Sequence, residues 1–205
     1  MFDGPGSYKE SNEMITPVII TILIVVAVLV LFVVCIGIMM YNRLVRLKIS
    51  AEKSWADVDV ELKRRHDLVP NLVETVKGYA SHEKETLESV VKARAAAVDA
   101  GSVGEASLAE GLLSQALGRL LAVVEAYPDL KANTNFMQLQ GELVQTENRI
   151  STSRQAYNGT ARQFNEYSSV FPSNIVAGFF RFDQLDYFEL KDEAAREAPK
   201  VQFSS

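Results

Sequence analysis

The chain has 205 residues, of which 21 are Lys or Arg, 26 are Asp or Glu, two are His and one is Cys. A single cysteine excludes an intramolecular disulfide and a Cys-rich zinc site, and two histidines are too few for a three-His metal site. Because these residues are so few, we expect no cofactor. The net charge of −5 argues against a nucleic-acid-binding protein, so we expect no nucleic-acid partner.

An uncharged apolar segment covers residues 18–40. As a helix it would be about 34 Å long, enough to cross a hydrocarbon core of about 30 Å. A cleaved signal peptide is the alternative, but its apolar core is usually about 7–15 residues long and follows a basic start. Here Asp3, Glu10 and Glu13 outnumber Lys9. We predict a short extracytoplasmic N-terminus at residues 1–16 and an uncleaved transmembrane helix at residues 17–40, which contacts the lipid bilayer.

The basic residues beside this helix predict its orientation, because Lys and Arg close to a membrane helix tend to stay in the cytoplasm. Lys9 alone precedes the helix, whereas Arg43, Arg46, Lys48 and Lys53 follow it. We therefore expect a single-pass membrane protein whose C-terminal domain is cytoplasmic. Residues 41–188 would form a cytoplasmic helical bundle, and residues 189–205 a charged, mobile tail.

Apolar or small residues recur in steps of three or four after the predicted span. They are Leu44, Leu47, Ala51, Trp55, Val58, Leu62, Val69, Leu72, Val76 and Tyr79. We predict one helix over residues 17–79, about 95 Å long. Pro70 is expected to kink this helix without ending it, because the apolar stripe resumes in phase at Leu72.

Three further helices are predicted from caps, turns and periodicity. The second begins near Ser81, the third covers about residues 105–126, and the fourth follows a cap at Asn133. Apolar residues spaced by seven define the fourth helix: Phe136, Leu143, Ile150, Tyr157, Phe164 and Phe171. The companion positions are mostly small or polar, so this seam fits a bundle helix better than a two-stranded zipper. The predicted fold class is all-α, with an N-terminal transmembrane helix continuous with an antiparallel four-helix bundle. Pro172 is expected to end the last helix of the bundle.

Polar residues form a second series spaced by seven, at Gln140, Glu147 and Arg154. If this face is inward, Glu147 needs a cation, and Arg64 or Arg65 on the first helix is the expected source. We interpret the set as a structural layer that fixes helix register. A ligand or proton site is the alternative. Loss of a fully buried pair of this kind would cost about 3–5 kcal/mol.

No enzyme template fits the sequence. The segment from His82 to Thr86 lacks the second histidine of a zincin helix, and Gly101 and Gly104 have no phosphate-loop context. No Ser, His and acid are brought together by a recognisable elbow. We therefore predict no catalytic residues and a non-enzymatic protein.

Eight large apolar residues are concentrated just after Pro172. They are Ile175, Val176, Phe179, Phe180, Phe182, Leu185, Tyr187 and Phe188. Eight are too many to leave in water on a small domain, and we predict an interaction surface here. Either they cap the end of their own bundle, or they bind a neighbouring subunit, another protein or the membrane surface.

Many stretches of the chain, in order, resemble the LemA family. They include residues 55–59, 65–73, 78–83, 127–132 and 136–140, together with Glu147, Arg154, Asn165, Phe171-Pro172 and Ala177-Gly178. The resemblance runs from about residue 40 to residue 203. The departures are small, such as Phe164-Asn165 where that family more often has Tyr-Asn. The resemblance implies an anchor in the bacterial inner membrane, a cytoplasmic helical bundle and no established catalytic activity. Relatives that include a protein of magnetosome membranes imply a role in membrane organisation.

Two functional hypotheses follow. In the first, the protein is a scaffold that forms a homo-oligomer and organises or shapes the membrane, with residues 175–188 taking part in assembly. In the second, it is a monomeric adaptor whose bundle docks an unidentified protein partner, such as a membrane protease or a signalling protein. The absence of a Gly/Ser-rich tether after the span favours the scaffold.

Overall fold

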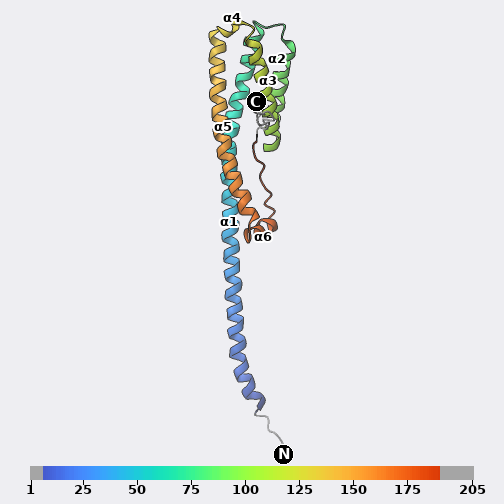
Figure 1. Ribbon diagram of the computed structural model, residues 1–205. Helices are drawn as coiled ribbons and strands as arrows, with labels where there is room; N and C mark the ends of the chain where they lie inside the picture. Colours follow the sequence, from blue (N-terminus) through green and yellow to red (C-terminus); the bar gives the residue numbers. More distant parts are fainter. Residues whose placement is uncertain (1–6, 190–205) are drawn as a thin grey trace, which may run out of the picture. The chain divides into compact units, whose positions relative to one another are not determined.

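The computed structural model describes residues 7–189, with side chains described from residue 17 onward. All regular elements in this part of the chain are helices, which confirms the predicted all-α class (Figure 1). The predicted N-terminal segment lies partly outside the described residues, and so does nearly all of the predicted tail. The described chain divides into two compact units. Of the described residues, 7–46 and 167–183 belong to one unit, and 47–166 and 184–189 belong to the other.

Helix α1 covers Ser7–Lys77 and confirms that the predicted span and the first bundle helix are continuous. It begins ten residues before Pro17, so the prediction of its start was wrong. Residues 8–14 are mostly good helix formers and extend the helix upstream of the proline. The helix continues through Pro70 and ends just before Gly78, whose N–H donates to the carbonyl of Glu74 at 3.3 Å.

The second and third helices form a hairpin, α2 at Lys84–Val98 and α3 at Val103–Val124. α2 starts three residues later than predicted from Ser81, because residues 81–83 form a turn. The start of α3 is capped at Ser102, whose hydroxyl accepts from the backbone N–H of Glu105 at 3.2 Å. The Glu105 carboxylate in turn accepts from the N–H of Gly101 at 2.8 Å, so side chains bond two backbone donors at this helix start.

A one-turn helix, α4 at Pro128–Lys131, leads into α5 at Thr134–Ser169, and α6 covers Ser173–Phe179. The predicted cap at Asn133 is confirmed, because its side-chain oxygen accepts from the N–H of Phe136 at 3.1 Å. α5 ends at Ser169, three residues before Pro172. Phe171 therefore lies outside the helix and is 79% exposed, so its assignment to the buried seam was wrong.

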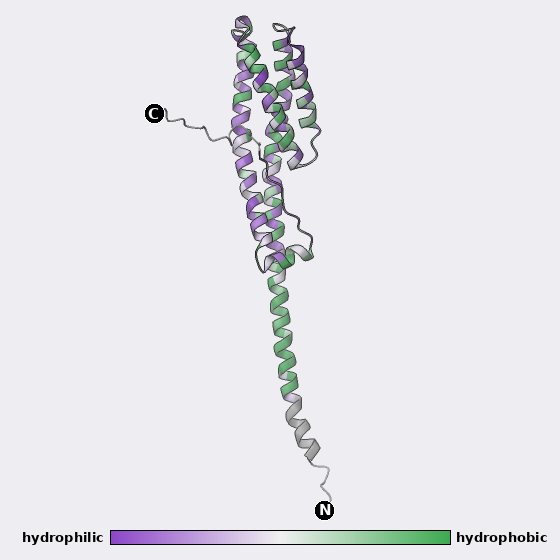
Figure 2. Ribbon diagram, turned by 45° about the vertical axis from the view of Figure 1, so that its right-hand side comes forward, coloured by the Kyte–Doolittle hydropathy of each residue, from purple (hydrophilic) through white to green (hydrophobic). Residues whose placement is uncertain are grey.

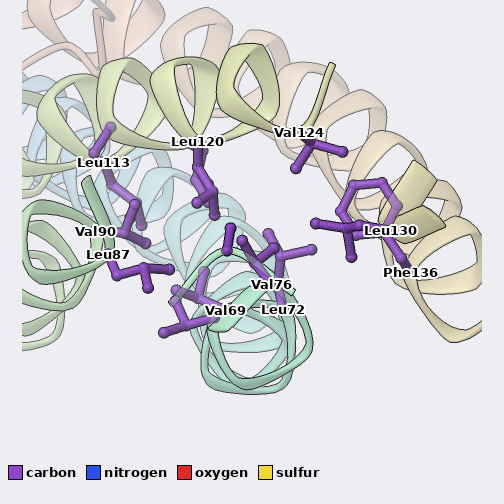
Figure 3. Close-up of a cluster of buried hydrophobic side chains, with 14 of the residues drawn as sticks. Val69, Leu72, Val76, Leu87, Val90, Leu113, Leu120, Val124, Leu130 and Phe136 are labelled. Carbon is purple, nitrogen blue, oxygen red and sulfur yellow. The ribbon is translucent and has the colours of Figure 1, made fainter. Parts of the chain in front are cut away.

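Two apolar clusters form the core of the unit that contains the bundle. In the first, side chains from α1, α2, α3 and α5 converge, and Leu130 of α4 closes one end (Figure 3). The second cluster contains Val58, Leu62, Ala106, Ile150, Tyr157, Ala161 and Phe188. The seam residues Phe136, Ile150, Tyr157 and Phe164 are buried, whereas Leu143 is half-buried. The heptad series of α5 therefore supplies core positions down to Phe164.

The other unit contains the apolar part of α1, coloured as a long hydrophobic stretch in Figure 2. Its most apolar window has a mean hydropathy of 3.6 and no buried residue, and the helix is long enough to cross a membrane. Aromatic side chains from residues 167–182 pack against α1 just after this apolar stretch. Tyr41 lies 4.6 Å from Phe180 and 5.8 Å from Phe182 between ring centroids, and the Arg43 guanidinium lies 4.5 Å over the Tyr167 ring.

Candidate functional site: a buried charge network, a clasped segment and exposed apolar faces

Arg65 and His66, consecutive on α1, both contact one buried carboxylate. Arg65 Nη1 lies 3.2 Å from Glu110 Oε2, and His66 Nε2 lies 2.5 Å from Glu110 Oε1. The Arg65 guanidinium also donates to the Ser114 hydroxyl at 2.9 Å. Glu110, on α3, is only 1% exposed. Both carboxylate oxygens are therefore engaged by donors from α1, which ties these two helices together at one register.

Glu147 joins this network from α5, with Oε2 at 3.2 Å from Arg65 Nη1. Its side chain is 45% exposed, so the expectation that it is buried was wrong. Arg64 and Gln140 are exposed, and Arg154 is half-buried. The predicted set of polar residues therefore does not form a closed, buried layer. The structure places the fully buried carboxylate on α3 instead.

Glu110 was missed by the sequence reasoning, although the sequence carries a signal for it. The core stripe of α3 passes through Ala106, Glu110, Leu113 and Leu117, in steps of four and three. An acidic residue in register with a core stripe must find donors when the helix packs, because an unpaired buried charge is strongly unfavourable. That register predicts a buried ion pair from α3 alone.

Arg94 on α2 completes the polar contacts around His66. Its Nε donates to the backbone carbonyl of His66 at 2.7 Å. In an uninterrupted helix this carbonyl would accept from the N–H four residues later, but that residue is Pro70, which has none. The Arg94 side chain replaces the missing donor, so the proline can remain inside α1 without leaving a bare carbonyl.

These groups interact mainly with one another. A recess of about 310 Å³ adjoins them, lined in part by Trp55, Leu62 and His66. Within the described residues, no cluster of three or more His, Cys, Asp or Glu could hold a metal ion. The arrangement is suited to holding α1, α3 and α5 in register.

An extended segment, residues 184–189, packs along α5 and is held by two asparagines. Asn165 donates to the Leu185 carbonyl at 2.9 Å and accepts from the Leu185 N–H at 2.8 Å. Asn158 makes the same pair of bonds with Phe188, at 3.1 and 2.9 Å. Each side-chain amide therefore bonds the chain as a neighbouring strand would.

Aromatic packing anchors the end of residues 184–189, which we call the clasped segment. Phe188 is completely buried, with ring centroids 5.6 Å from Trp55, while Trp55 lies 5.3 Å from Tyr157. The Tyr157 hydroxyl donates to the Asp186 carbonyl at 2.7 Å. Burial, with a smaller effect of the Asp186 carboxylate, raises the pKa of Tyr157 to about 12. Both surroundings disfavour the phenolate.

The predicted interaction surface is therefore divided. Phe188 belongs to the core and Leu185 packs against it, so these two follow the alternative of packing on their own bundle, and their place in the candidate interaction surface was wrong. Val176 and Phe182 are half-buried, and Tyr187 is 40% exposed. The side chains that remain open are Ile175, Phe179 and Phe180, and Phe179 is 80% exposed.

A second open apolar face lies on α3. Leu108 and Leu112, one turn apart, are 59% and 56% exposed. Gly111 and Gly118 share this side of the helix by their spacing. A Cβ added at either glycine would meet no atom within 4 Å beyond the helix's own backbone and the neighbouring residues. Within residues 17–189, the glycines therefore have no packing role.

Comparison with known proteins places these features in a family. The LemA family model matches residues 54–203. The magnetosome proteins MamQ 1 and MamQ 2 of Paramagnetospirillum magneticum are each 28% identical over 179 residues, covering 75% of this chain and 66% of the relative. Protein LemA of Metamycoplasma hominis is 26% identical over 162 residues, covering 78% of this chain and 71% of the relative. The chain thus spans just under two thirds of the length of these MamQ proteins.

Proposed function

Because this chain belongs to the LemA family, we propose that it is a non-enzymatic, single-pass membrane scaffold that self-associates to organise or shape the membrane. The apolar segment of α1 supports the anchor. The basic residues after this segment support a cytoplasmic bundle at a bacterial inner membrane. The MamQ relatives, named as magnetosome proteins, support a role at a membrane compartment.

The open face of α3 is the observation that carries self-association. A glycine inside a helix costs about 1 kcal/mol relative to alanine, and Gly111 and Gly118 have no intramolecular contact that offsets it. The absence of side chains lets a second helix approach closely, and Leu108 and Leu112 supply apolar contact beside the gap. A second copy of the same face would fit it by two-fold symmetry.

The buried charge network supports the non-enzymatic part of the proposal. Arg65 and His66 on α1 contact Glu110 on α3, and both carboxylate oxygens of Glu110 are thereby bonded within the bundle. Such a network is suited to specifying one arrangement of helices. A bundle with one defined arrangement presents one defined α3 face.

The test measures the mass of the full-length protein in mild detergent by light scattering. Gly111→Ala with Gly118→Ala should raise thermal stability, by about 1 kcal/mol per site, and yet reduce the oligomer fraction. Gly141→Ala on α5 also enters open space and is the matched control, which should raise stability without changing assembly. A monomeric wild type, or an oligomer that the double alanine variant leaves intact, would contradict self-association through α3.

Membrane organisation needs a separate measurement. Full-length protein reconstituted into vesicles should change their shape in electron micrographs, and Leu108→Ser with Leu112→Ser should abolish the change. Val144→Ser, at an equally exposed position on α5, is the control that should leave it intact. A periplasm-dependent reporter fused after Ser205 should be silent if the bundle is cytoplasmic, and activity there would reverse the orientation.

One observation favours the adaptor as the second candidate function. An apolar groove of about 730 Å³ lies between α1 and α2, with Val73, Leu87 and Val91 among its lining residues. Lys77, Lys84 and Lys92 line it together with Glu74 and Glu88, so it suits an amphipathic helix with charges of both signs on its flanks. If the purified protein is monomeric and Val91→Glu abolishes capture of a specific partner, the adaptor replaces the scaffold.

A further inference from the structure

Four large apolar residues form an exposed patch beside the end of the apolar stretch of α1. This apolar patch consists of Phe171, Ile175, Phe179 and Phe180. Ile175 and Phe179 are one turn apart on α6, and the Phe179 ring packs against Phe180 with centroids 5.0 Å apart. Residues 170–180 contain no charged side chain. Nothing within the described chain covers the patch, although exposed apolar groups on this scale mark contact sites.

The position of the patch within its unit identifies what covers it. The Phe180 ring lies 4.6 Å from the ring of Tyr41, the first residue after the apolar segment 18–40. If that segment crosses the bilayer, its length of about 34 Å matches the hydrocarbon thickness of about 30 Å, so Tyr41 lies at the membrane–water boundary. A ring in contact with Tyr41 lies at the same boundary. Aromatic side chains concentrate at this level in membrane proteins.

Cationic groups adjoin the same boundary. Arg43 and Arg46, with Met39 and Asn42, line a recess of about 300 Å³ on the turns of α1 that follow the apolar stretch. Guanidinium groups at this level can bond lipid phosphates, while the rings enter the acyl boundary. Cations on α1 and apolar rings that contact α1 at the same level are together the arrangement that a lipid interface recognises.

We infer that the apolar patch inserts into the interfacial zone of the bilayer leaflet from which α1 emerges. The lipid surface is thus a second contact of this protein with the membrane, besides the span. The inference rests on the membrane anchoring included in the proposed function but not on self-association. Among the contacts that the sequence left open for residues 175–180, namely their own bundle, a subunit, another protein and the membrane surface, this inference selects the membrane surface.

Fluorescence of a single indole tests the assignment. Trp55 is the only tryptophan. In the full-length protein carrying Trp55→Phe, Phe179→Trp is reconstituted into phosphatidylcholine–phosphatidylglycerol vesicles with ordinary or brominated acyl chains. Emission should shift to the blue and be lost as brominated lipid replaces ordinary lipid. Ile175→Trp provides a second position on the patch, and each variant is first shown by circular dichroism to be folded.

Indoles at two control positions, and one measurement in a variant with an altered α3 face, make every outcome decisive. Val144→Trp on α5 should stay red-shifted and unquenched, and Phe32→Trp in the span should be quenched. Red, unquenched emission from positions 175 and 179 would overturn the inference. Blue but unquenched emission would also overturn it, because the patch would then contact protein. An unquenched indole at position 32 would overturn the anchor and this inference together. Repeating the measurement with Leu108→Ser and Leu112→Ser should leave quenching at position 179 unchanged, which separates it from self-association.

Discussion

Replacing Glu110 by alanine should be among the most damaging single changes to the charge network. The carboxylate is 1% exposed and holds both Arg65 and His66. Removing one partner of a buried pair typically costs about 3–5 kcal/mol, because the other charge stays buried and unpaired. Arg65 would keep Glu147 at 3.2 Å and the Ser114 hydroxyl, so we expect the lower end, about 3 kcal/mol. At about 2–4 °C per kcal/mol, the melting temperature should fall by about 6–12 °C.

The matched comparison is Glu147→Ala. Its partner is the same guanidinium at the same distance, but 45% of the side chain is exposed, and exposed ion pairs contribute about 0–1 kcal/mol. Burial alone therefore predicts at least a threefold difference in cost between the two variants. Replacing Arg65 by Met and Glu110 by Leu together should recover most of the loss, because apolar side chains leave no buried charge.

The assay is thermal and urea unfolding of the full-length protein in detergent, followed by circular dichroism. Equal melting temperatures for Glu110→Ala and the wild type would refute the reasoning. So would a Glu147→Ala variant that loses as much as Glu110→Ala, since the network would then be centred on α5, as the sequence pattern first indicated.

Three further predictions concern other contacts of the bundle. Arg94→Met should cost about 1–3 kcal/mol in unfolding experiments by baring the His66 carbonyl, and adding Pro70→Ala should restore most of it by supplying a backbone N–H; no rescue would contradict the role assigned to Arg94. Because the pKa of Tyr157 is raised to about 12 from 10.0, its hydroxyl contributes stability that is fully present below pH 10 and declines as the pH rises to 12. Relative to Tyr157→Phe, the wild type should lose about 1.4 kcal/mol per pH unit in that window, and parallel pH profiles would contradict this. Phe188→Ala should cost about 3–5 kcal/mol in thermal melts, whereas an unchanged melt would mean that the clasped segment detaches in solution.

The helices were largely predictable because periodicity and caps are local signals. The stripe that continues past Pro70 predicted one helix, and Asn133 marked the start of α5 because an asparagine oxygen caps the next turn. Phe171 was misplaced because a heptad count does not register that the helix has already ended at Ser169. A spacing of seven residues places side chains on one face of a helix only as far as the helix continues.

The site was less predictable because burial depends on which elements meet. Glu147 and Glu110 are both acids in helical patterns, and only the packing of α3 against α1 decides which one loses its water. For Leu185 and Phe188 the sequence did not decide between an interaction surface and packing on their own bundle, because residues 184–189 follow no helical period. The side chains that bind this segment, Asn158 and Asn165, lie about 20 to 30 residues earlier in the chain.

The spacing of Asn158 and Asn165 also determines how residues 184–189 align along α5. They are seven residues apart on a helix, which advances about 10.5 Å over that interval. The residues they hold, Leu185 and Phe188, are three apart in extended chain, which advances about 10 Å. Two helical turns and three extended residues are thus commensurate, so both amides can be satisfied at one alignment of the segment. Sliding it by a single residue would misplace both pairs of bonds and withdraw the Phe188 ring, so the alignment is all or none.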